Sequence, residues 1–110
     1  MQIENIQQAL IALNDHFDGP LSETSDSKRF KLASGQILKI TSDLGKLSTK
    51  LLKRNTADLG PELSSLLTSV IMAACYLDIN LEGSLHTYFE ALDKEIIDNT
   101  GLSLTDILEP

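Results

Sequence analysis

The sequence has 110 residues, of which 42% are hydrophobic and 23% are charged, a composition that suits one compact domain and argues against wholesale disorder. One cysteine and two histidines exclude an internal disulfide and a structural zinc module. The formal net charge of −7 argues against nucleic acids and membranes as general partners.

Apolar residues at helical spacing predict the first two helices. Over residues 2–17 they recur at steps of three and four and line one side of a helix, which ends before a Gly-Pro pair. Residues 18–27 are rich in turn formers and acids and predict a connection without apolar periodicity. Over residues 28–54 the apolar steps continue for three heptads, which predicts a long helix packed along a narrow seam.

A third helix is predicted over residues 61–77, where Pro61 and then Glu62 are typical of a helix start. This helix is apolar nearly all round. Because a 110-residue monomer has difficulty covering such a helix, a second subunit is its natural cover. After a break at residues 78–80, a fourth helix is predicted over residues 81–99.

These elements predict one all-α domain over residues 1–110, an antiparallel four-helix bundle with a short last turn over residues 103–108. We expect it to assemble as a homodimer or a dimer of dimers through the second and third helices. No basic region precedes an apolar stretch at the N-terminus, and the longest nearly apolar run, residues 66–77, is too short to cross a membrane. We therefore expect a cytoplasmic protein without a membrane partner.

Charge is divided unevenly along the chain. Residues 28–54 hold eight of the nine basic residues and one acid, a net charge of +7, whereas the remainder carries −14. The basic segment either pairs with the acidic remainder, within the domain or across an oligomer interface, or forms an anion site. The overall charge favours pairing.

Recognised catalytic motifs, namely a Gly-rich phosphate loop, a GxSxG elbow, an HExxH pair and an EF-hand loop, do not occur in the sequence, which lowers the expectation of an enzyme. His16 and His86 have no partner at metal-ligand spacing, and Cys75 lies in the most apolar helix. All three are interpreted as structural. Aromatic residues make up 5% of the chain, too few for a base-stacking surface, so binding of nucleic acid is not expected.

Three short segments carry a resemblance to a known family. Residues 40–47 read ITSDLGKL, residues 61–67 read PELSSLL, and residues 76–82 read YLDINLE. Over roughly residues 30–95 this pattern resembles the MazG-like all-α nucleotide pyrophosphohydrolases. The resemblance rests on a Gly-x-Leu in the second helix, a Leu-Leu pair in the third and the turn before the fourth.

The resemblance implies a site in which two carboxylates, one turn apart on each of two facing helices, hold Mg²⁺ ions that bridge a triphosphate and activate water. The family's acids fall on five positions of this sequence, and only two of the five are carboxylates. The positions are Ser42, Asp43 and Lys46 in the second helix and Glu62 and Ser65 in the third. The family's later phosphate-binding lysine and asparagine fall on Tyr88 and Leu92. Binding of two Mg²⁺ ions is therefore not expected.

A vestigial site is expected instead at Asp43, Lys46, Glu62 and Ser65, without a metal and without catalytic residues. In this interpretation the Lys46 ammonium lies between the Asp43 and Glu62 carboxylates and replaces the metal electrostatically. Two alternatives remain, a single Mg²⁺ held by Asp43 and Glu62, or ordinary helix-surface charges that form weak pairs.

Lysines at helical spacing also line one flank of the second helix and predict an anion-binding stripe. They are Lys39, Lys46, Lys50 and Lys53. Such a stripe can bind phosphate without a metal, but it competes with pairing to Glu62, Asp58 or the acids of the first and fourth helices.

Three functions follow from these patterns. The leading hypothesis is a MazG-like protein that has lost metal-dependent nucleoside triphosphate pyrophosphohydrolase activity and serves as a nucleotide-binding or protein-interaction module. The enzyme alternative is an active pyrophosphohydrolase with an altered single-metal site. The third is a helical adaptor that docks an acidic partner protein through the lysine stripe.

Overall fold

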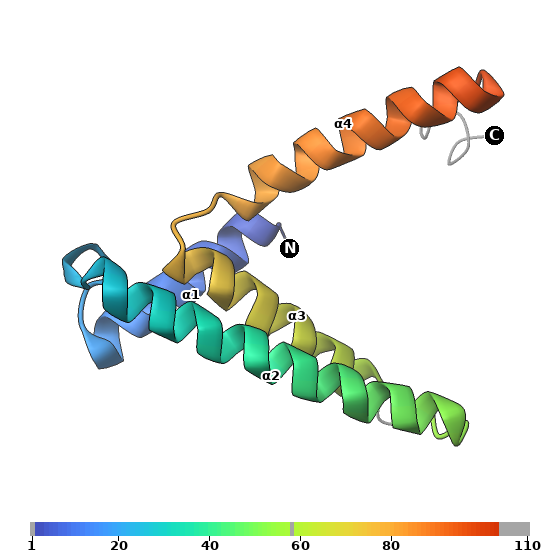
Figure 1. Ribbon diagram of the computed structural model, residues 1–110. Helices are drawn as coiled ribbons and strands as arrows, with labels where there is room; N and C mark the ends of the chain where they lie inside the picture. Colours follow the sequence, from blue (N-terminus) through green and yellow to red (C-terminus); the bar gives the residue numbers. More distant parts are fainter. Residues whose placement is uncertain (1, 58, 104–110) are drawn as a thin grey trace. The chain divides into compact units, whose positions relative to one another are not determined.

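The computed structural model describes residues 2–57 and 59–103, and this part of the chain is built from helices (Figure 1). The prediction of an all-α protein is therefore confirmed. The elements in chain order are α1 (Ile3–Asp18), the short 3-10 turn η1 (Leu21–Glu23), α2 (Asp26–Leu52), α3 (Leu59–Tyr76) and α4 (Leu81–Thr100). The turn predicted over residues 103–108 lies outside the described residues, apart from Ser103.

The structure differs from the predicted ranges at several helix ends and in one connection, and three of these differences have local reasons. The connection over residues 18–27 contains η1, because buried Leu21 is anchored there by its backbone N–H, which donates to Asp15 Oδ1 at 3.0 Å. Helix α2 begins at residue 26 rather than 28, since the Ser25 hydroxyl caps it by accepting from the Lys28 N–H at 3.2 Å. Helix α3 begins two residues before Pro61, which costs no hydrogen bond because the first N–H groups of a helix have no intrahelical partner.

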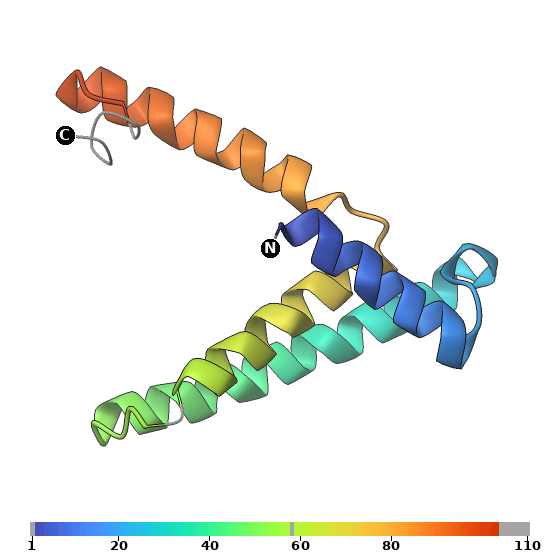
Figure 2. The same ribbon diagram turned by 180° about the vertical axis from the view of Figure 1, so that it is seen from behind.

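The chain divides into two units, Met1–Asn80 and Leu81–Pro110. In the first, α2 and α3 run antiparallel side by side and α1 packs across the C-terminal end of α3 (Figures 1 and 2). The second unit contains α4, a single helix of 20 residues.

The core of the first unit lies around the C-terminal half of α3. Ile71 is its most buried large side chain, with 1% of its surface exposed. Small residues pack beside it, so the three helices approach closely: Ala33, Ala73, Ala74 and Cys75 are all buried. The buried amide of Gln7 on α1 donates to the Ile79 carbonyl at 2.6 Å and satisfies the backbone beyond α3. The prediction of a helix buried on several sides therefore holds for this half of α3, whereas Leu63 and Leu67 in its first half are exposed in the single chain.

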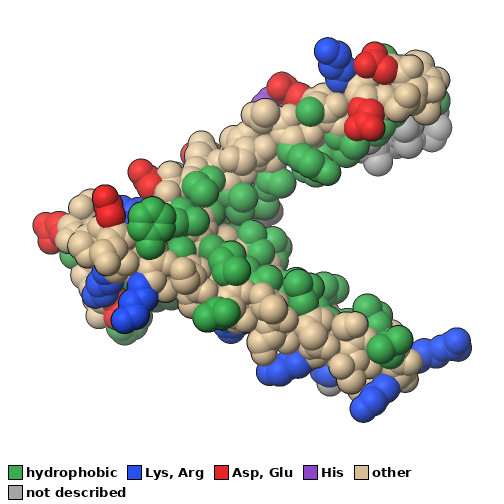
Figure 3. Space-filling view, viewed as in Figure 1, with side chains coloured by type: hydrophobic (Ala, Val, Ile, Leu, Met, Phe, Trp, Pro, Cys, Tyr) green, Lys and Arg blue, Asp and Glu red, His purple; other side chains and the backbone are tan. Residues whose placement is uncertain are grey.

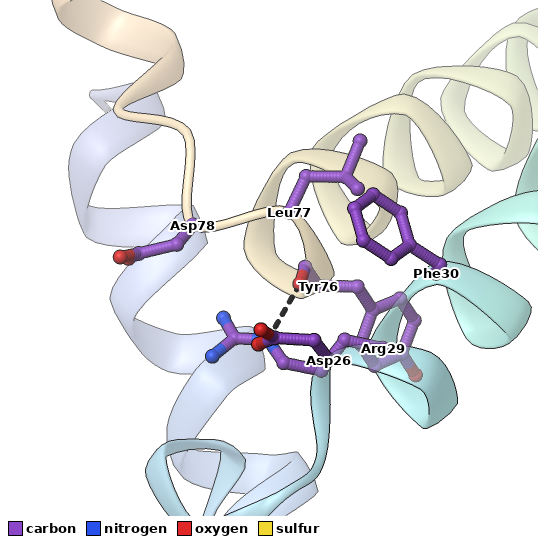
Figure 4. A pocket seen from close by; sticks show the side chains of 6 residues that line it. All are labelled: Asp26, Arg29, Phe30, Tyr76, Leu77 and Asp78. Atoms are coloured by element: carbon purple, nitrogen blue, oxygen red, sulfur yellow. Dashed lines mark hydrogen bonds between the residues drawn. The ribbon is translucent and has the colours of Figure 1, made fainter.

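Arg29 of α2 binds the carbonyl end of α3 (Figure 4). Its Nε donates to the Tyr76 carbonyl at 2.7 Å, and its two terminal nitrogens donate to the carbonyls of Cys75 at 3.3 Å and Leu21 at 3.4 Å. The last carbonyls of a helix have no intrahelical donor and carry partial negative charge, so a guanidinium satisfies both needs. Arg29 thus ties α2, α3 and η1 together.

Among the described residues, α3 is long and apolar enough to cross a membrane by length and composition, with a mean hydropathy of 1.2 over its 18 residues, of which 33% are buried. Core helices of soluble proteins can have the same length and composition.

Candidate functional site

Four polar residues from facing sides of α2 and α3 surround one cavity of about 230 Å³. They are Asp43 and Lys46 of α2 and Glu62 and Ser65 of α3. Each pair is separated by three residues, so both of its members lie on one side of their helix. Helices α2 and α3 pack side by side (Figure 1), and the shared cavity places these two sides opposite each other. The structure therefore brings together all four residues of the predicted vestigial site.

The Asp43 carboxylate is bound by a lysine from the preceding turn of α2. Lys39 Nζ lies 3.2 Å from Asp43 Oδ2 and also donates to the hydroxyls of Ser65 and Ser69, both at 3.1 Å. The two serines belong to α3, so the ammonium uses its three donors to link the helices. Ser69 is buried, and the sequence analysis did not identify its part in this link.

The Glu62 carboxylate is bound by Lys50, the second lysine that crosses from α2 to α3. Lys50 Nζ pairs with Glu62 Oε1. The other oxygen, Oε2, is buried and has no hydrogen-bond partner among the described residues. Glu62 also lies in the first turn of α3, where the partial positive charge of the helix terminus favours a carboxylate.

Lys46 lines the same cavity as Asp43 and Glu62, but the ion pairs predicted between it and the two carboxylates are not found among the described residues. The ammonium groups that contact Asp43 and Glu62 belong to Lys39 and Lys50, and within the described part of the chain Lys46 forms no ion pair within 4 Å. Lys39 lies four residues before Asp43 on the same helix face, and Lys50 lies opposite the start of α3 because the connection after α2 is short. Spacing alone could not decide among four flexible lysines.

A second cavity, of about 560 Å³, lies along the C-terminal half of α2. Three lysines of the predicted stripe line it, whereas Lys39 does not. The full lining is Ser42, Gly45, Lys46, Thr49, Lys50, Lys53 and Asn55. The sequence analysis missed the neutral members of this set. The signal for them is their helical spacing, since Ser42 and Thr49 lie four residues before and three residues after Lys46. Asp58, a proposed partner of the stripe, lies outside the described residues.

The residues around the first cavity do not fit the two-Mg²⁺ site that the resemblance implies. Between residues 2 and 103, leaving out residue 58, no group of three or more His, Cys, Asp or Glu side chains is placed to hold a metal ion. The two carboxylates that remain are each bound by an ammonium group, and a third ammonium, on Lys46, belongs to the cavity wall. A divalent cation prefers carboxylate and carbonyl oxygens and is repelled by ammonium groups.

The cysteine and the two histidines lie outside both cavities. Cys75 is buried, its thiol donates to the Gln7 carbonyl at 3.7 Å, and burial raises its pKa, so the thiolate is disfavoured. His86 pairs with Glu90 on the exposed surface of α4 at 2.9 Å. His16 packs edge-on against the Phe17 ring at the end of α1.

Comparison with known proteins gave no relative on which to base an assignment. No protein-family model matches the sequence, and neither the curated proteins nor the solved structures include a significant match.

Proposed function

We propose that this chain is a MazG-like helical protein that has lost metal-dependent nucleoside triphosphate pyrophosphohydrolase activity and serves as a nucleotide-binding or protein-interaction module in the cytoplasm. One observation carries the proposal. The two acids that remain at the family's positions, Asp43 and Glu62, line one cavity, and each is bound by a lysine of α2.

The charge balance at this cavity supports binding of an anion over binding of a metal. Two carboxylates meet three ammonium groups, those of Lys39, Lys46 and Lys50. A Mg²⁺ ion would have to displace two of these cations and approach the third, at an electrostatic cost that grows as water is excluded. A phosphate group is attracted to the same cations.

Hydrolysis assays test the loss of activity. We expect no release of pyrophosphate from a panel of nucleoside triphosphates with Mg²⁺ or Mn²⁺, and binding of nucleotide in a calorimetric titration. Turnover that is lost in Asp43→Asn and Glu62→Gln, and kept in the control Asp98→Asn on α4, would overturn the proposal. It would establish the alternative, an active pyrophosphohydrolase with a single metal on Asp43 and Glu62.

The adaptor alternative rests on the cavity that Lys46, Lys50 and Lys53 line, where no acid from the described part of the chain joins them. An acidic partner protein would bind there through several lysines, and its affinity would fall steeply with salt. Titration with an acidic polypeptide, poly-glutamate, separates this alternative from nucleotide binding.

The proposal includes the architecture, an antiparallel four-helix bundle assembled as a homodimer or a dimer of dimers. Its support is a row of apolar side chains on α2 at seven-residue spacing, each at least half exposed in the single chain (Figure 3). The row consists of Phe30, Ile37, Leu44 and Leu51. Such a row is typical of a helix that packs against a further helix, and a soluble surface seldom exposes one of this length.

Light scattering tests the assembly. We expect dimers or larger particles at micromolar concentration, and dissociation in Leu44→Glu, because a carboxylate in an apolar interface is costly to bury. A 12.0 kDa particle that stays monomeric under dilution and concentration alike would overturn this part of the proposal.

A further inference from the structure

The larger cavity on α2 differs from its neighbour in lacking acidic groups. Lys46, Lys50 and Lys53 line it, and no aspartate or glutamate among residues 2–57 and 59–103 does. The charge of Lys50 is compensated by Glu62, whereas Lys46 and Lys53 have no ion-pair partner among the described residues. In a protein of net charge −7, two uncompensated cations therefore face one cavity.

The spacing of the lysines suits an elongated anion. They follow one another at steps of four and three along α2, so they extend over about 10 Å of helix at 1.5 Å per residue. Gly45 leaves the wall open beside them, because a Cβ at this position would meet nothing within 4 Å. The volume, about 560 Å³, lies in the usual range for small-ligand sites.

Neutral hydrogen-bond donors complete the lining. The Ser42 hydroxyl and the Asn55 side-chain amide form no hydrogen bond with any residue in the described ranges, so both are free to donate to a ligand. Thr49 instead donates its hydroxyl to the Gly45 carbonyl at 3.1 Å. The described residues that line the cavity include no apolar or aromatic side chain, so they offer no surface on which a nucleobase could stack.

We propose that this cavity binds the phosphate chain of a nucleoside triphosphate directly through Lys46, Lys50 and Lys53, without a metal ion and without recognition of the base. The inference rests on the proposed function and specifies its ligand class. Two consequences separate it from metal-dependent binding. Inorganic tripolyphosphate binds about as tightly as ATP or GTP, and Mg²⁺ weakens binding, because it neutralises the phosphate charges that the lysines attract.

Isothermal titration with inorganic tripolyphosphate tests this directly. The titrations compare the wild type with Lys46→Gln, Lys53→Gln and the control Lys31→Gln, which lies on α2 outside the cavity. We expect each cavity variant to bind roughly tenfold more weakly, as for loss of one hydrogen bond to a charged group, and the control to bind like the wild type. Circular dichroism verifies that the variants are folded.

The remaining outcomes each contradict a distinct statement. Nucleotide binding that tripolyphosphate does not compete for would overturn this inference and leave the proposed nucleotide binding intact. Equal weakening in all three variants would show general attraction to a basic segment and no site. Binding of poly-glutamate through Lys46 and Lys53, with no affinity for tripolyphosphate, would assign the cavity to an acidic protein and overturn both the inference and nucleotide binding.

Discussion

The two ends of the α2–α3 hairpin are held together in different ways. At the core end, residues 26–36 and 69–80, small side chains pack around Ile71 and Arg29 binds the last carbonyls of α3. At the charged end, residues 39–57 and 59–65, Lys39 and Lys50 cross between the helices, and both cavities of interest lie there. The difference indicates that stability resides mainly at one end and charge chemistry at the other.

The largest expected effect comes from removing the central side chain of the core end. Ile71→Ala should lower the free energy of unfolding by about 2–5 kcal/mol, because a fully buried side chain is lost and a cavity remains. The counterpart at the charged end, Lys50→Gln, should cost about 1 kcal/mol or less, since both members of the Lys50–Glu62 pair are partly exposed. Chemical denaturation measures both changes, and equal losses would contradict the comparison.

The next effect concerns Arg29, which binds the last carbonyls of α3 at the core end. Arg29→Met keeps the aliphatic stem but leaves the carbonyls of Cys75, Tyr76 and Leu21 without this donor. We expect a loss of about 1–3 kcal/mol in unfolding free energy. The unfolding free energy of Arg29→Lys should lie between those of Arg29→Met and the wild type, because lysine keeps the charge without the forked geometry. A lysine variant no more stable than the methionine variant would show that the geometry alone matters.

The helices themselves follow from the sequence, whereas several of their ends do not. Apolar spacing is a property of each segment and predicts α1 to α4 with boundaries within about two residues, the usual uncertainty of helix ends. The turn η1 depends on a contact from Asp15 to Leu21 that no local pattern contains. The start of α2 depends on which of several adjacent polar residues, Ser25 among them, caps the helix.

Part of the candidate site also follows from the sequence, and part does not. The placement of Asp43 and Glu62 at one cavity follows from their register on two antiparallel helices, which the sequence pattern contains. The choice of counter-ion does not, because a lysine has a long flexible stem and reaches several neighbours from one backbone position. Lys39 and Lys50 therefore replaced Lys46 as the partners of the two acids.

A smaller effect at the charged end sharpens the interpretation of Lys46. Lys46→Glu would gather three carboxylates around the cavity of about 230 Å³, opposed by two lysines. We expect a loss of about 1 kcal/mol from repulsion, and recovery in millimolar Mg²⁺, because the oxygen ligands then outnumber the cations. Lys46→Gln is the control and should change stability by no more than about 0.5 kcal/mol, with no response to Mg²⁺. If Lys46→Glu behaves like this control, the carboxylates do not interact across the cavity.

The smallest expected effect concerns the C-terminal ends of α2 and α3, one at each end of the hairpin. Both helices end with the same backbone geometry. After α2, Arg54 at φ 55° donates its N–H to the Leu51 carbonyl. The N–H of Asn55 donates to the Lys50 carbonyl at 2.9 Å. Asp78 has the same φ and the same pair of bonds after α3. This is the Schellman ending, in which glycine is usual because a left-handed φ strains a residue with a Cβ.

Arg54→Gly should therefore raise the free energy of unfolding by about 0.5–1 kcal/mol, the relief of strain exceeding the added freedom of the unfolded chain. Asp78→Gly should gain less, since aspartate tolerates the left-handed region better than arginine does. Lys53→Gly is the matched control, because Lys53 has φ −84° and gains nothing from glycine, so it should lose roughly 0.5–1 kcal/mol. Thermal or chemical denaturation gives all three values. A loss in Arg54→Gly would mean that the arginine side chain stabilises the charged end by more than its backbone strain costs.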